Sequence, residues 1–149
     1  MPTVADIRSG FITNLRTKFG VQDWQITGYT QSAPIPPCFD IELAGDGVEY
    51  DEAMDRGADL WTWTIRALVP KTSDQGSQAT LDLLIAPAGS SSVKEALESD
   101  PSLGGAADAI HVTKVSGPRQ IGVPVPSAPP NVYHGCDWTV VVWARGISS

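Results

Sequence analysis

The chain has 149 residues, of which 42% are hydrophobic and 18% are charged, and its formal net charge is −7. This length favours one domain, and this composition is typical of a globular protein rather than a disordered one. The ten Lys and Arg residues are scattered along the sequence. A protein that grips DNA phosphates needs a basic patch, so the composition argues against a protein that holds nucleic acid. The apolar runs are too short to predict a membrane span, and we expect no membrane partner.

The N-terminal segment predicts an amphipathic helix. Thr3 can accept from the backbone at its start, and Asp6 follows three residues later, as in a capping box. Apolar side chains then recur at a spacing of four, at Ile7, Phe11 and Leu15. This spacing places them on one side of the helix, where they can face a core.

Four extended segments follow the helix. Residues 23–30, 38–45, 47–54 and 60–69 have the alternation or the β-branched and aromatic content of strands. In 60–69, Trp61 and Trp63 fall on one face and the threonines fall on the other. Segments 47–54 and 60–69 are close enough in sequence to predict a hairpin.

The middle of the chain predicts two helices. One of the polar residues at 72–74 can cap a helix that carries Leu81 and Leu84, and Pro87 ends it. Ser92 with Glu95 forms a second capping box, which opens a short helix.

Two further strands are predicted at 109–117 and 136–146, the second with apolar side chains on both faces, as suits a central strand. The proline-rich loop at 118–131 lies between them, and so many prolines exclude a central strand there. A long loop in a compact domain is usually functional. We interpret it as a docking arm for a neighbouring subunit, with a polyproline ligand for another protein as the alternative. The candidate subunit or tube interface consists of Pro118, Arg119, Ile121, Val123, Val125 and Tyr133.

Together these elements predict an α+β fold for the single domain 1–149. We expect a mostly antiparallel, twisted sheet, with the N-terminal helix and the two central helices packed on it, gathered on one face. The large indole side chains are expected to be core or interface anchors, since each buries much apolar area. These anchors are Trp61, Trp63, Trp138 and Trp143.

An acidic run precedes the tryptophan-rich strand, and it raises the question of chemistry. Its members are Asp46, Glu49, Asp51, Glu52, Asp55 and Asp59. Glu49 and Asp51 share one strand face about 7 Å apart, a spacing that suits an acid/base pair or a divalent cation. However, no histidine pair, metal-ligand cysteine motif or glycine-rich phosphate loop completes a site. We therefore expect no enzyme, no catalytic or metal-binding residue and no cofactor, with a small metal-dependent enzyme as the alternative.

Several spaced motifs from Tyr50 to Gly117 resemble a small tail protein of long-tailed, siphovirus-type phages that infect actinobacteria. They are Tyr50-Asp51, Arg56-Gly57, the strand ending in "ALVPKTSDQ", "LDLLIAPAGSSSVKEALESD", "LGG" at 103–105 and "IHVTKV". The N-terminal helix and the C-terminal strand fit the same layout, so most of the chain is covered. The family is the phage tail terminator, or a closely related head–tail joining protein. The loop at 118–131 is longer than expected in that family.

This resemblance implies a structural virion protein in the neck region of the tail, assembled in the host cytoplasm. It implies a homohexameric ring that caps the tail tube, ends tube polymerisation and meets the head connector. DNA passes through such a ring without specific binding. The partners are then other copies of the chain, the tail tube protein and the head–tail connector or head-closure protein. A head-closure or tail-completion adaptor is the alternative. The acids at 46–59 line the channel in one interpretation and form a solvated outer surface in the other.

Overall fold

Three α-helices and six β-strands form the part of the chain described by a computed structural model, namely residues 3–19, 24–27, 37–50, 58–69, 74–89, 91–125 and 128–145. The helices are α1 (Val4–Phe19), α2 (Asp74–Ile85) and α3 (Val93–Leu97), followed by the short 3-10 helix η2 (Leu103–Gly105). The strands are β1 (Gln25–Thr27), β2 (Cys38–Glu49), β3 (Ala58–Val69), β4 (Ala109–Val115), β5 (Arg119–Val125) and β6 (Ala128–Arg145).

The strands form one sheet, in which β6 pairs with three other strands. Their order is β1-β2-β3-β6-β4, and β5 pairs with β6 off this path. β1 and β2 run parallel, while the other pairs are antiparallel. The predicted α+β class with a mostly antiparallel sheet is therefore confirmed. The central position expected for 136–146 is confirmed as well, since β3 and β4 flank this part of β6.

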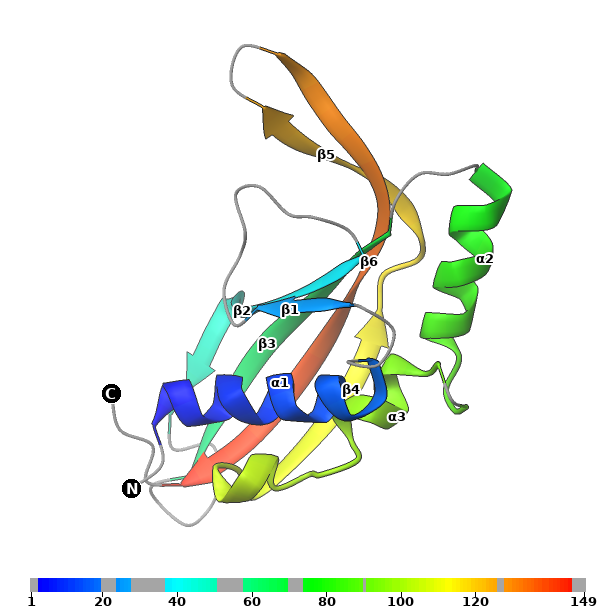
Figure 1. The fold of residues 1–149 in the computed structure, drawn as a ribbon. Helices are drawn as coiled ribbons and strands as arrows, with labels where there is room; N and C mark the ends of the chain where they lie inside the picture. Colours follow the sequence, from blue (N-terminus) through cyan, green and yellow to red (C-terminus); the bar gives the residue numbers. More distant parts are fainter. Residues whose placement is uncertain are drawn as a thin grey trace.

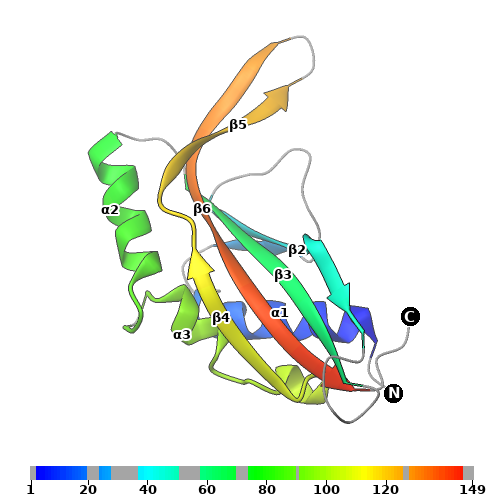
Figure 2. The same cartoon turned by 180° about the vertical axis from the view of Figure 1, so that it is seen from behind.

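α1 lies across one face of the sheet, α3 lies near the end of α1, and α2 stands beside the sheet (Figure 1). Seen from behind, the strands lie in front of α1 (Figure 2). The stripe predicted for the first helix is confirmed, because Ile7, Phe11 and Leu15 are fully buried. Phe11 meets Trp63 edge to face, with ring centroids 5.8 Å apart. We call this covered side of the sheet the helix face, and it holds the main core.

The capping box predicted at Thr3 is present, whereas at Ser92 only one half of the predicted box forms. At α1, the Thr3 backbone N–H donates to Asp6 Oδ2 (2.7 Å), and the Asp6 N–H donates to Thr3 Oγ1 (3.2 Å). At α3, the Glu95 N–H donates to Ser92 Oγ (3.2 Å), but the Glu95 carboxylate accepts from the Gly89 N–H (2.8 Å). Glu95 therefore fastens the α2–α3 connection instead of closing the box on Ser92.

The prediction of separate strands at 38–45 and 47–54 is wrong, because β2 is one strand from Cys38 to Glu49. Its pairing with β3 shifts register between Leu43 and Val48, and Gly47 has a positive φ of 66°. Such a bulge bends a strand without ending it, so the glycines at this point do not break the strand. The predicted hairpin with β3 is confirmed by the pairs Val48–Trp61 and Glu49–Leu60.

The prediction of a loop at 118–131 is also wrong. β5 and the first part of β6 form a hairpin, with register from Arg119–Gly135 to Val125–Ala128. It extends away from the rest of the sheet (Figure 1). Prolines are tolerated there because an edge strand needs to donate hydrogen bonds on only one side. We call the segment 119–135 the arm.

Candidate functional site

The sheet has a second face, opposite the helices, which we call the open face. In Figure 2 none of the described helices covers it. Its centre consists of alternate residues of β3 and β6, paired as Leu60–Trp143, Thr62–Val141, Thr64–Thr139 and Arg66–Asp137. All of these are half-buried, with apolar pairs near one end and a charged pair near the other. An antiparallel sheet with one polar face is common, but Trp143 and Val141 are unusual residues to leave to water.

The charged residues of the open face differ in sign between the strands at its two sides. On β2 they are the acids Asp40, Glu42 and Glu49, which alternate onto this face by their pairing with Arg66, Thr64 and Leu60. On β4 and β5 they are Lys114 and Arg119, opposite Thr139 and Gly135, and His111 lies on the same face opposite Val141. The open face therefore has an acidic side at β2 and a basic side at β4 and β5.

Two ion pairs cross this face where the arm begins. Arg66 binds the buried carboxylate of Asp40, and Arg119 binds Asp137. Thr27 Oγ1 also lies 3.4 Å from Asp40 Oδ1. The first pair joins β2 to β3 and the second joins β5 to β6. Because Asp40 is only 2% exposed, its pairing with Arg66 offsets a large desolvation cost.

The base of the arm packs on the open face. Cys38, Leu68 and Val123 form a small buried cluster, and Ile121 and Tyr133 pack against it. Gly135 is required at this point, since a Cβ there would lie 2.7 Å from Ile121 Cδ1. The arm is thus anchored by side chains on one of its faces.

The residues predicted as an interface therefore have mixed positions. Ile121, Val123 and Tyr133 contact the chain's own sheet, whereas Arg119 is exposed in its ion pair with Asp137. Pro118 is half-buried just before β5. Val125 belongs to β5, and its side chain lies outside the described part. The large exposed apolar residue of the arm is Val132, which is 42% exposed and which the candidate list omits.

Only some of the predicted acids lie among the residues that the structure describes. Glu49 is exposed at the end of β2, and Asp59 is half-buried in β3. Asp46 lies in β2, and its side chain is not described; Asp51, Glu52 and Asp55 lie outside the described residues. Among the residues that the structure places, no group of three or more His, Cys, Asp or Glu has metal-ligand geometry.

The tryptophans divide between the two faces. Trp61, Trp63 and Trp138 are buried on the helix face, where they are core anchors. Trp143 is half-buried on the open face, next to Leu60.

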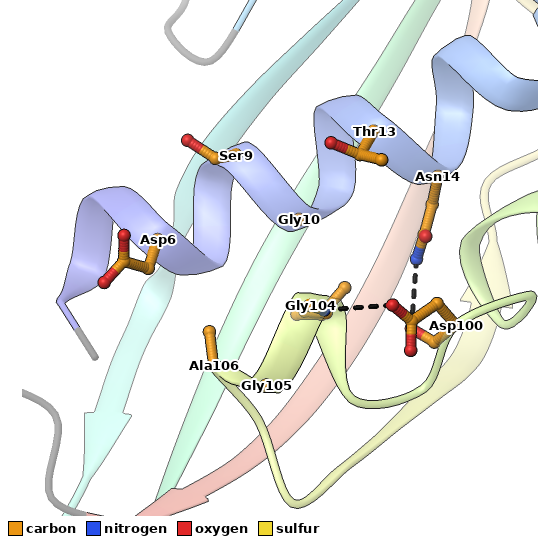
Figure 3. A pocket seen from close by; sticks show the side chains of 10 residues that line it. Asp6, Ser9, Gly10, Thr13, Asn14, Asp100, Gly104, Gly105 and Ala106 are labelled. Atoms are coloured by element: carbon orange, nitrogen blue, oxygen red, sulfur yellow. Dashed lines mark hydrogen bonds between the residues drawn. The ribbon is translucent and has the colours of Figure 1, made fainter. Parts of the chain in front are cut away.

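A pocket of about 500 Å³ lies between α1 and the turns around η2 (Figure 3). Asn14 reaches from α1 and donates to the carbonyl oxygens of Leu97 (2.9 Å) and Asp100 (3.1 Å). The Asp100 carboxylate accepts from Ser102 Oγ (2.7 Å) and from the N–H groups of Ser102 and Gly104. These hydrogen bonds, the Ser102 hydroxyl first, lower the pKa of Asp100. The polar groups of this pocket brace the turn against α1.

The two thiols are not poised for reaction. Cys38 and Cys136 are fully buried. Burial raises the pKa of each thiol to about 12, with the neighbouring carboxylate of Asp40 or Asp137 adding to the effect. Both thiols are therefore neutral at physiological pH and poor nucleophiles. His134 is buried in β6, and His111 is exposed on β4.

Comparison with known proteins does not assign the chain to a family. A scan against models of protein families gives no match, and a search of curated proteins gives none either. No described helix has both the length and the apolar character needed to cross a membrane.

Proposed function

We propose that this chain is a structural virion protein, a phage tail terminator. Copies of it form a ring that caps the finished tail tube, ends tube polymerisation and offers a surface to the head connector, while DNA passes through the ring. The spaced motifs between Tyr50 and Gly117 support this function, and so does the α+β fold that the resemblance implies.

The observation that carries the proposal is the arm. β3 pairs with β6 as far as His134, so the six residues 128–133 extend beyond β3, together with β5. Six strand residues span roughly 20 Å. A two-stranded hairpin is only marginally stable by itself in water. Val132 is exposed on it, which suits an element that contacts another protein subunit.

A ring makes a specific demand on its subunit. Because each copy meets two neighbours by different surfaces, the subunit needs two complementary patches. The arm and the open face are two distinct surfaces of this chain. Their presence on one subunit is compatible with a closed, head-to-tail assembly.

The first test is the size of the assembly. Purified protein, alone and with the tail tube protein, is examined by mass photometry and negative-stain microscopy. We expect rings, and we expect the arm to be required. Val132→Asp, which places a charge on the exposed arm, should reduce ring formation, whereas Leu83→Asp on the exposed side of α2 should not.

The second test is tail length in the phage. Deleting the gene should give tails of irregular length, and supplying the wild-type chain should restore uniform ones. Tails of normal length without the protein would contradict the terminator role. If tails keep their length but heads fail to join, the chain is a neck adaptor, and labelling it in virion micrographs locates it.

A further inference from the structure

We propose that copies of this chain associate side by side through the two edges of the sheet, with the acidic β2 side of one copy against the basic β4 side of the next. This inference names the subunit contact within the proposed ring and so rests on that function. It does not require the arm to make the same contact.

The β2 side is a true edge along much of its length. β1 pairs only with Cys38–Asp40, so in the part of the chain that is described β2 has no outer neighbour from residue 41 to 49. Glu42 and Glu49 both lie in this stretch, and both are exposed on the open face. This edge strand therefore carries exposed acidic side chains on the open face.

The β4 side is the opposite edge at the same level of the sheet. Lys114 pairs with Thr139, which in turn is opposite Thr64 and Glu42, so Lys114 and Glu42 lie in one cross-strand row. His111 lies one row nearer the Trp143 end. Both basic side chains are exposed.

Glu42 and Lys114 are too far apart to contact each other within one copy. Three strand spacings separate β2 from β4, which is about 14 Å and exceeds the Debye length in physiological salt. Across a contact between two copies, the same groups would be adjacent. A second copy of this chain carries both signs of charge at the matching edges, whereas an unrelated partner with charge of one sign would complement only one edge. Charge complementarity therefore favours a second copy at this contact.

Strand direction is compatible with this arrangement. Three successive antiparallel pairings place β4 antiparallel to β2, so a neighbour in the same orientation brings its β4 antiparallel to β2. Rotation about an axis repeats this contact and closes a ring. The bulge between Leu43 and Val48 interrupts the β2 edge, so the contact is made by side chains more than by a continuous backbone ladder.

Two charge-reversed variants test the contact. The acidic-side variant is Glu42→Lys with Glu49→Lys, and the basic-side variant is His111→Glu with Lys114→Glu. Each variant alone brings like charges together at every contact, and we expect each to need at least about tenfold more protein for assembly than wild type. In an equimolar mixture, a ring in which the two variants alternate has opposite charges at every contact. The mixture should therefore assemble as wild type does.

Asp82→Lys and Arg16→Glu are the matched controls, since both side chains are exposed on helices away from the open face. Neither should change assembly. Mass photometry measures the species, and circular dichroism checks that every variant is folded. Wild-type assembly should also weaken as salt rises from 0.1 to 1 M, an experimental range in which exposed charges become screened.

The outcomes separate this inference from the proposed function. Rings that form equally well in both variants overturn the edge contact and leave the tail terminator intact. Normal tail length without the gene, with assembly still lost in each variant and restored in the mixture, overturns the terminator and supports the contact. A mixture that recovers only dimers shows face-to-face packing and overturns the side-by-side arrangement.

Discussion

β3 presents tryptophans to one side of the sheet and threonines to the other. On the helix face, Trp61 and Trp63 are buried in the main core, and Phe11 of α1 packs on Trp63. On the open face, Thr62 and Thr64 lie among half-buried residues and ion pairs. The same strand thus serves stability on one side and offers a surface on the other. Substitutions on the two faces should separate these roles.

The largest expected effect is on the helix face. Trp63→Ala should lower the free energy of unfolding by about 3–5 kcal/mol, because Trp63 is fully buried and Phe11 packs on it. Trp143→Ala should cost about 1–2 kcal/mol, because Trp143 is only half-buried. Urea unfolding measures both values under conditions in which the protein is monomeric. Equal losses would show that the two faces do not differ in this way.

The next effect concerns the arm's anchorage on the open face. In Gly135→Ala the new Cβ meets Ile121 and the backbone of β3, so we expect a loss of about 1–3 kcal/mol and faster amide exchange in the arm. Gly117→Ala is the control, because a Cβ there has no neighbour within 4 Å. It should change stability by less than about 0.5 kcal/mol. A stable Gly135→Ala protein with a protected arm would contradict this anchorage.

A smaller loss of stability is expected at the start of α3. Ser92 caps α3 and donates through Oγ to the Ala86 carbonyl at 2.6 Å. Ser92→Ala should cost about 1 kcal/mol in urea unfolding, since it removes the cap. Ser116→Ala, at an exposed position beyond β4, should be close to neutral. A neutral Ser92→Ala would mean that packing alone holds α3 on the sheet.

The smallest effect is the pH dependence of stability that Glu95 and Asp100 contribute. The Gly89 N–H and then Lys18 lower the pKa of Glu95 from 4.5, and Ser102 first lowers that of Asp100 from 3.8. A lowered folded-state pKa contributes stability that is present above these values and is lost as the pH falls through the folded-state pKa. The urea midpoint should therefore fall below about pH 4. Glu95→Gln with Asp100→Asn should flatten this fall, and an unchanged slope would assign it to other groups.

Much of the fold follows from local patterns. The spacing of Ile7, Phe11 and Leu15 and the two caps predict helices correctly, because a helix is specified by near neighbours. The two errors have one cause. Gly47 and the prolines of the arm indicate interruptions, yet a bulged strand tolerates the former and an edge strand the latter.

The candidate surface was less accessible to sequence reasoning. Strict alternation would place Glu42 and Glu49, which are seven residues apart, on opposite faces, and only the bulge between Leu43 and Val48 brings them to one face. The alternation of β4 places His111 on one face of its own strand. Only the strand order shows that these residues lie on opposite edges of one open face, with β3 and β6 between them. That order depends on pairings between segments more than 60 residues apart, such as Trp63–Val140, which a single sequence does not reveal.

The central position of β6 has a consequence for biosynthesis. A ribosome synthesises β3 and β4 before residues 128–145, so the nascent chain holds two unpaired inner edges until β6 emerges. Such edges invite association with other chains. A chain interrupted before β6 lacks the strand that joins both halves of the sheet and that carries one side of the arm. Such a chain lacks the β6 half of the centre of the open face and cannot present the complete surface.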